Sequence, residues 1–124
     1  MSVQVESEIG TLEAVVLHTP GPEIESMTPK TAHEVLYNDI IPLQVVRDEH
    51  RRLKQFLSGL CEVHEAADVI AAGLADESVR QLMVNRICEA YWCRDRRDEM
   101  LGLAPEDLAR TIIGGLPVRN DSVT

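Results

Sequence analysis

A short apolar segment, Leu12–His18, is bounded on both sides by residues that favour turns. Its centre, Val15–Leu17, is continuously apolar, which is typical of a strand that is buried on both faces. Pro20 and Pro22 then end the strand, because proline lacks the backbone N–H that a sheet needs and restricts the residue before it. We therefore expect one short, buried strand near the start of the chain.

Two helices are expected after this strand. Thr28 is a suitable N-cap for a short first helix, since Pro29 follows at a position where a helix needs no N–H donor. The second helix lies between Pro42 and Gly59 and has the strongest periodicity in the chain. Its apolar face, with spacings of three and four residues, consists of Leu43, Val46, His50, Leu53, Leu57 and Leu60.

A second strand is expected at "CEVHEA", residues 61–66, where Cys61, Val63 and Glu65 alternate with two polar residues. The order strand–helix–helix–strand predicts two neighbouring parallel strands that are joined by a helical crossover. Two strands do not form a stable open sheet alone, and both would have unpaired edges. The first half of the chain therefore reads as an α/β unit that lacks sheet partners.

From Ala66 onward the sequence predicts one helix after another. Asp76 is placed to cap the second of these helices, and Pro105 opens the last one, which a pair of glycines ends. The residues expected to face inward are Val69, Ile70 and Leu74, then Val79, Leu82, Met83, Ile87 and Ala90, and finally Leu108, Ile112 and Ile113. We divide the chain into a strand-helix-helix-strand module, 1–65, and a helical region with a C-terminal tail, 66–124.

The formal net charge of −9 excludes several classes of partner. Binding of nucleic acid or of an anionic membrane needs clustered Lys and Arg. The Arg-rich stretches "RDEHRRLK" and "CRDRRDE" are interleaved with acids, which is typical of solvated helix faces. The N-terminal residues do not resemble a secretory signal, and no segment approaches the roughly 18 apolar residues that span a bilayer. We expect a soluble, cytoplasmic protein without a nucleic-acid or membrane partner.

Three cysteines, Cys61, Cys88 and Cys93, do not predict a disulfide framework, because an odd number in a reducing compartment argues against one. Their spacing fits no zinc motif and the four histidines are scattered, so we expect buried thiols and no metal site. His50 lies on the apolar face of the second helix. We expect a buried, hydrogen-bonded structural histidine there rather than a catalytic one.

Four segments together resemble the arginine deiminase family. They are "SEIGTLEAVVLHTPGPEI" (7–24), like the family's Ser–Glu–x–Gly, apolar strand and Pro–Gly; "MTPKTAHEVLYNDI" (27–40), like its "LTP" and "ELLFDD"; "VVRDEHRRLKQFLSGLCEV" (45–63), like its long helix with a Glu–His pair; and "PEDLARTIIGGLP" (105–117), like its "LaxxLigG" helix. The four blocks have the family's order and spacing and cover nearly the whole chain.

The resemblance implies a fold and an activity. The fold is an incomplete α/β propeller of the pentein type, with 1–65 as part of the propeller and an inserted helical subdomain within 66–124. The activity is hydrolysis of L-arginine to L-citrulline and ammonia. The family uses a cysteine nucleophile, a histidine acid/base and carboxylates that grip the guanidinium, with no metal or organic cofactor.

The residues that would do this chemistry have no counterpart here. The family's "NxxFxRD" block, its histidine with a partner acid and its nucleophilic cysteine all follow the region of resemblance, and none of the three cysteines matches the nucleophile. Leu36 alone maps to a substrate-binding position, where the family acts through its backbone. The local sequence "EVLYND" places Tyr37 and Asn38 where the family has Phe and Asp. A structural role for Leu36 at a helix end is an equal alternative, and we assign no catalytic residue.

We therefore expect the N-terminal portion of an arginine deiminase, truncated and inactive alone. Its partners would be L-arginine, as substrate of the complete enzyme, and the missing C-terminal part or a complementing chain. The alternatives are one chain of a split deiminase and a small acidic protein-interaction module. Amidinotransferases and dimethylarginine hydrolases share the propeller, but the early helical insert favours arginine deiminase.

Overall fold

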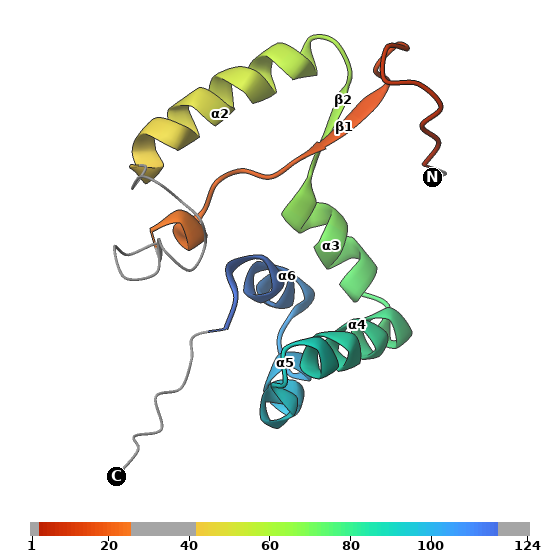
Figure 1. Cartoon of the computed structure of the whole chain (residues 1–124), viewed down its shortest axis with the longest axis vertical. Coiled ribbons are helices and arrows are strands. Elements are labelled where there is room, and N and C mark those ends of the chain that lie inside the picture. Colours follow the sequence, from red (N-terminus) through yellow and green to blue (C-terminus); the bar gives the residue numbers. More distant parts are fainter. Residues whose placement is uncertain (1–2, 26–41, 117–124) are drawn as a thin grey trace.

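The computed structural model describes residues 3–25 and 42–116. The helix that we expected from Thr28 onward lies outside these residues. Figure 1 shows the described part as two regions: two strands with a long helix beside them, and a group of shorter helices. The chain passes directly from the first region to the second, because α3 (Ala66–Leu74) begins at the residue after the second strand.

The two strands, β1 (Ala14–Leu17) and β2 (Glu62–Glu65), are parallel neighbours. Ala14 pairs with Glu62 and Leu17 pairs with Glu65, so the two strands end at the same level. The predicted strands and their parallel arrangement are confirmed. The shared end matters for the site below, since both chains leave the strands at one edge.

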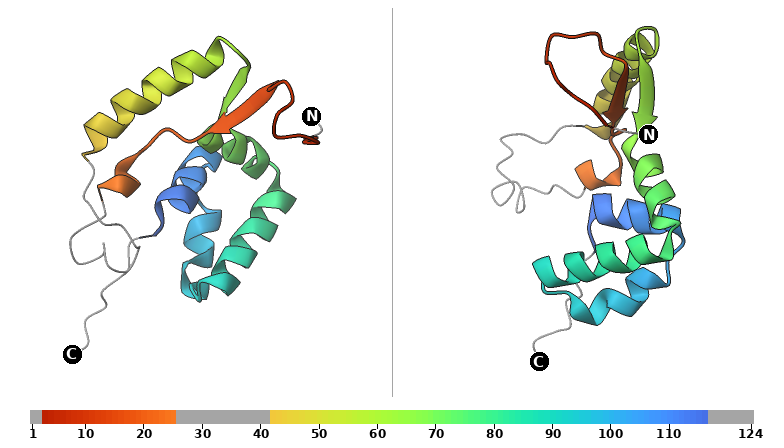
Figure 2. Two further views of the ribbon diagram at one scale, coloured as in Figure 1. Left: turned by 45° about the horizontal axis from the view of Figure 1, so that its top comes forward. Right: turned by 90° about the vertical axis from the view of Figure 1, so that its right-hand side faces the viewer.

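The long helix α2 (Leu43–Ser58) confirms the strongest periodic signal of the sequence. It lies along one side of the strand pair and contacts β2 (Figure 2). The helix ends where the backbone N–H of Gly59 bonds to the carbonyl oxygens of Phe56 and Leu57. Among the described residues, no side chain of α2 is fully buried, although the sequence of the helix is strongly amphipathic.

The second region is helical, as predicted. It consists of α3, α4 (Glu77–Ala90), the 3-10 turn η2 (Arg94–Arg96), α5 (Arg97–Leu101) and α6 (Pro105–Gly114). The expected boundaries are confirmed: Asp76 accepts hydrogen bonds from the first turn of α4, Pro105 opens α6, and Gly115 ends it with a φ of 80° that glycine adopts without strain. Local chemistry thus sets these helix ends.

The hydrophobic core of the described residues lies in the helical region. Its buried members are Leu74, Val84, Cys88, Met100, Leu108 and Ala109. α6 packs across α3 and supplies Leu108 and Ala109, while α4 and α5 close the other side. Burial of a Leu or Met side chain contributes roughly 1.5–3 kcal/mol each, so these contacts stabilise the helical group.

The inward face that we predicted for α4 is wrong in its main residues. Val79, Leu82 and Met83 are exposed, with Leu82 at 55%, whereas Val84 and Cys88 are buried. The reason is that α3, η2 and α5 contact α4 on the side that carries Val84 and Cys88. Of the predicted face, Ile87 packs against the core.

The expectation that the first strand is buried on both faces is also wrong for the described residues. Val16 is 57% exposed, and Val15 and Leu17 are only half-buried. Within residues 3–25 and 42–116, β1 pairs with β2 alone, so one edge and one face have no covering element. The two-stranded sheet is open, and the propeller and the division at residue 65 remain predictions.

No helix within the described ranges is long and apolar enough to cross a membrane.

Candidate functional site

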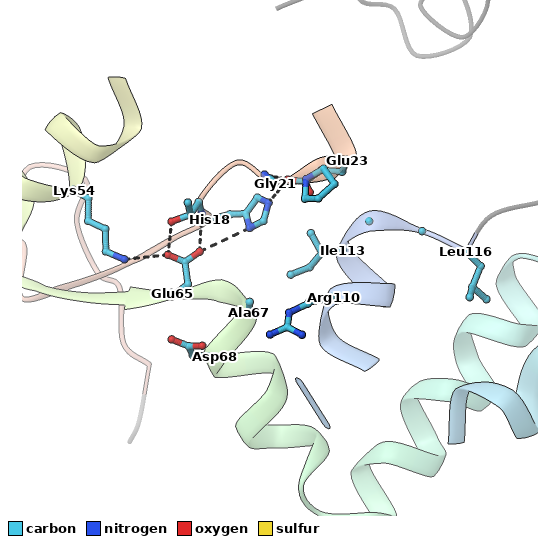
Figure 3. Close-up of a pocket in the computed structure, with 14 residues that line it drawn as sticks. His18, Gly21, Glu23, Lys54, Glu65, Ala67, Asp68, Arg110, Ile113 and Leu116 are labelled. Atoms are coloured by element: carbon cyan, nitrogen blue, oxygen red, sulfur yellow. Dashed lines mark hydrogen bonds and ion pairs between the residues drawn. The ribbon is translucent and has the colours of Figure 1, made fainter. Parts of the chain in front are cut away.

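A cleft of about 870 Å³ lies between the strand region and the helical region (Figure 3). It opens at the shared carboxyl-terminal end of the strands, at His18 after β1 and at Glu65, the last residue of β2. The 3-10 turn η1 (Pro22–Ile24) and Lys54 of α2 continue this wall, and α3 and α6 form the opposite one. Ligand sites in α/β proteins commonly lie at the carboxyl ends of parallel strands, which makes this cleft the candidate site.

The carboxylate of Glu65 is held by three hydrogen bonds from two residues. The backbone N–H and the hydroxyl of Thr19 donate to it at 2.6 and 2.8 Å, and Lys54 Nζ donates at 3.2 Å. Burial alone would raise the pKa of Glu65, but these hydrogen bonds outweigh it and hold the pKa below its ordinary value. Glu65 is therefore an ionised anchor that joins β2, α2 and the chain after β1.

The imidazole of His18 lies between two carboxylates. Its Nε2 is 2.8 Å from Glu23 Oε1, and its Nδ1 is 3.9 Å from Glu65 Oε1 (Figure 3). Burial would raise the pKa of Glu23, whereas the hydrogen bonds from His18 and from the Gly21 backbone lower it, and the net shift is downward. The imidazole of His18 thus connects the carboxylate of η1 with the carboxylate at the end of β2.

The sequence "HTPGPE" forms this arrangement through local geometry. The carbonyl oxygen of Pro20 accepts a hydrogen bond from Arg47 Nε at 2.8 Å, which fixes the turn against α2. The N–H of Gly21 donates to Glu23 Oε1 at 2.6 Å. A Cβ at Gly21 would stand 2.5 Å from the other carboxylate oxygen of Glu23 and would displace that flexible group from His18. Glycine therefore leaves the room that the carboxylate occupies.

The opposite wall supplies charges that are less tightly held. Asp68 on α3 is exposed, and Arg110 on α6 pairs with Asp107 at 2.9 Å. Ile113 and Leu116 provide apolar surface beside them (Figure 3). The cleft thus presents both signs of charge together with an apolar patch, which suits a small polar ligand that carries both charges.

The cleft as described lacks a nucleophile of the expected kind. No cysteine belongs to its lining, and the hydroxyl of Thr19 already donates to Glu65. Cys61 and Cys93 are half-buried and Cys88 is buried in the helical core. The described residues that line the cleft therefore do not form a thiol nucleophile with an adjacent base.

The substrate-binding residue that we predicted, Leu36, lies outside the described residues. His50 is half-buried on α2, and its Nε2 is buried with no hydrogen-bond partner within the described part of the chain. The described residues therefore provide no hydrogen bond to Nε2, and the structural role of His50 stays a prediction. His50 is not among the described residues that line the cleft.

Sequence reasoning missed the cluster of His18, Glu23, Lys54 and Glu65. A signal was present, because His18 and Glu65 directly end two strands that were predicted to be parallel, and parallel strands end at one edge. The reach of Lys54 across from α2 had no such signal. Among residues 3–25 and 42–116, no group of three or more His, Cys, Asp or Glu side chains is arranged to hold a metal ion.

Comparison with known proteins gives relatives that are named arginine deiminase, although no protein-family model matches the chain. The chain is 31% identical over 128 residues to an arginine deiminase of Limosilactobacillus reuteri, which covers 98% of this chain and 31% of that protein. It is 32% identical to an arginine deiminase of Bacillus cytotoxicus and 34% identical to one of Limosilactobacillus fermentum, each over 92% of this chain and 30% of the relative. The chain therefore spans about a third of the length of these curated relatives.

Proposed function

We infer, from the premise that this chain is related to the arginine deiminases over nearly its whole length, that it corresponds to the amino-terminal portion of an arginine deiminase-like hydrolase. The complete enzyme would convert L-arginine to L-citrulline and ammonia by attack of a cysteine on the guanidinium carbon. Residues 1–65 would be part of an α/β propeller and the following helices its insert. The chain alone would be inactive, and the reaction would need no metal or organic cofactor.

One observation carries this proposal. Relatives that are 31–34% identical match 92–98% of this chain but only 30–31% of their own length. The matched segment is therefore less than a third of a full deiminase, and the remaining part would supply the nucleophile.

The described residues support the same reading in two ways. The cleft holds anchored acids and a histidine but no thiol. Large apolar side chains are exposed on the strand region, at Val16, Phe56 and Leu60, which is typical of a surface that other polypeptide covers. The rest of a propeller would cover it and would pair with the free edges of the sheet.

A chimera tests the proposal directly. The matching segment of the Limosilactobacillus fermentum arginine deiminase is replaced by residues 1–124, and citrulline production from L-arginine is measured for the chimera and for the chain alone. We expect citrulline from the chimera and none from the chain. Citrulline from the chain alone, or a chimera that melts cooperatively yet is inactive, contradicts the proposal.

Leu36 can be tested in the same chimera. We propose that it binds substrate through its backbone, so Leu36→Ala should retain most activity, whereas Leu36→Pro, which removes the N–H and restricts the backbone, should lower kcat/KM. Equal loss in both variants contradicts a backbone role.

The isolated chain also separates the proposal from the interaction-module alternative. A portion of a larger enzyme should associate through its exposed apolar surface, whereas an independent module should melt in one cooperative transition as a monomer or closed oligomer. Sedimentation and thermal melting of the purified chain distinguish the two outcomes.

A further inference from the structure

The C-terminal end of α4 is a turn that brings two cysteines together. Trp92 follows the capping residue Tyr91 and has the left-handed φ of 56°. The backbone N–H of Cys93 donates to the carbonyl oxygen of Cys88 at 3.2 Å. A six-to-one hydrogen bond across a left-handed residue is the Schellman motif, which is frequently accompanied by a contact between the side chains of its first and last residues. In this chain both of those side chains are thiols.

The surroundings of the two thiols differ. Cys88 is 2% exposed and belongs to the helical core, whereas Cys93 is half-buried and packs against the same core from the turn. Burial first, and then the charge and hydrogen bond of Cys93, raise the pKa of the Cys88 thiol. Because Cys88 is buried and Cys93 is only half-buried, oxidants from solvent reach Cys93 before Cys88. Cys61 belongs to the other region, where its Sγ contacts the carbonyl oxygen of Leu57 at 3.5 Å.

We propose that Cys88 and Cys93 form a reversible intrachain disulfide when hydrogen peroxide or an organic peroxide oxidises the protein. The Cys93 sulfur attacks a peroxide oxygen, the O–O bond breaks, and a sulfenic acid forms with release of water or an alcohol. The Cys88 sulfur then attacks the Cys93 sulfur, the S–O bond breaks, and water leaves with the thiol proton as the S–S bond forms. The two thiols together lose two electrons, which reduce the peroxide, and an external dithiol restores them.

The turn is accessible and constrained at the same time. Tyr91 and Trp92 are both exposed, so a small peroxide can approach Cys93 from the turn. A left-handed conformation at a bulky residue is unfavourable, yet the turn is fixed because Cys88 is held in the core and Cys93 packs against it. A disulfide needs its two cysteines close together, and here the Cys93 thiol is within hydrogen-bonding reach of the Cys88 thiol before any oxidation.

Tryptic peptide mapping tests the proposal on the full chain. The folded protein is treated with one equivalent of hydrogen peroxide, quenched with iodoacetamide, and digested without reduction. Trypsin cleaves after Arg86 and Arg94, so one peptide, Ile87–Arg94, contains both cysteines of the turn, and Cys61 is in another. We expect the first peptide to lose two hydrogen atoms in mass and to take two alkyl groups only after reduction, while Cys61 is alkylated from the start.

Two variants at the turn show whether its geometry matters. Trp92→Gly retains the left-handed turn, whereas Trp92→Val opposes it, since β-branched residues avoid this conformation. We expect the valine variant to form the disulfide roughly 5-fold more slowly than the glycine variant, with unchanged helical circular dichroism. Cys88→Ser should leave Cys93 as a sulfenic or sulfinic acid, which shows that Cys88 is the resolving thiol.

Three results would overturn the proposal. One is a disulfide that links Cys61 to either cysteine of the turn or links two chains. Another is further oxidation of Cys93 while Cys88 stays a free thiol in the unchanged protein. The third is equal rates of disulfide formation in the two Trp92 variants and in protein unfolded by urea, since the turn would then contribute nothing.

Discussion

Replacing Glu65 by Gln should loosen the junction between the strands, α2 and the chain that leaves β1. Glu65 is 16% exposed and accepts hydrogen bonds from the backbone and hydroxyl of Thr19 and from Lys54. Glutamine has the same shape but no charge, and the NH₂ of its amide would face the donors of Thr19 or Lys54. Hydrogen bonds to charged groups contribute roughly 1.5–3 kcal/mol, and because Thr19 and Lys54 can turn to water we expect a loss of about 1–2 kcal/mol.

Amide hydrogen exchange with mass spectrometry measures this loss where it occurs. A change of about 1–2 kcal/mol corresponds to exchange of the β1 and β2 amides that is roughly 5- to 30-fold faster. The matched control is Glu62→Gln on the same strand, whose exposed carboxylate is 3.4 Å from His64 Nε2 and should contribute under about 1 kcal/mol. Equal acceleration in the two variants would refute the reasoning.

The effect of Glu65→Gln should also depend on pH. Folding lowers the pKa of Glu65, so the folded state binds a proton less readily than the unfolded state. The stabilisation is therefore fully present above the unfolded value of 4.5 and is lost as the pH falls through the lower folded pKa. After correction for intrinsic exchange rates, the difference from the unchanged protein should be constant near neutral pH and shrink below 4.5. A difference that grows on acidification would contradict this sign.

Three further predictions concern the helical region. Leu108→Ala removes a side chain that is 0% exposed and should lower the free energy of unfolding, measured in urea, by about 2–5 kcal/mol. The control Leu82→Ala, at an exposed position, should change it by no more than about 0.5 kcal/mol. Similar losses in the two variants would mean that the core is misplaced. Asp76→Ala should destabilise α4, because two backbone N–H groups lose their acceptor. These hydrogen bonds lower the pKa of Asp76, so the difference in stability between the variant and the unchanged protein, measured in urea titrations, should fade as the pH falls below 3.8. Trp92→Gly should raise the urea midpoint by an amount worth about 0.5–1 kcal/mol, because Trp92 is 92% exposed and its positive φ suits glycine; a lower midpoint would show that the indole makes contacts that stabilise the turn.

Much of the local structure was predictable because it depends on neighbours in sequence. The spacing of apolar residues in α2, the cap at Asp76, and the proline and glycines that bound α6 are interactions over a few residues. The parallel strands followed from their order and the helical connection between them. Of the candidate site, only the convergence of His18 and Glu65 could have been predicted, because it requires nothing beyond two parallel strand ends.

What the sequence by itself determined is where helices and strands begin and end, since hydrogen bonds and backbone preferences there are local. The tertiary structure alone decided which stripe of α4 is buried, because Val84 and Cys88 are covered by neighbouring helices and Leu82 is not. It likewise decided that Lys54 reaches Glu65 and that a left-handed Trp92 brings Cys93 to Cys88. Burial and long-range contacts depend on which surfaces meet, and periodicity within one segment does not contain that information.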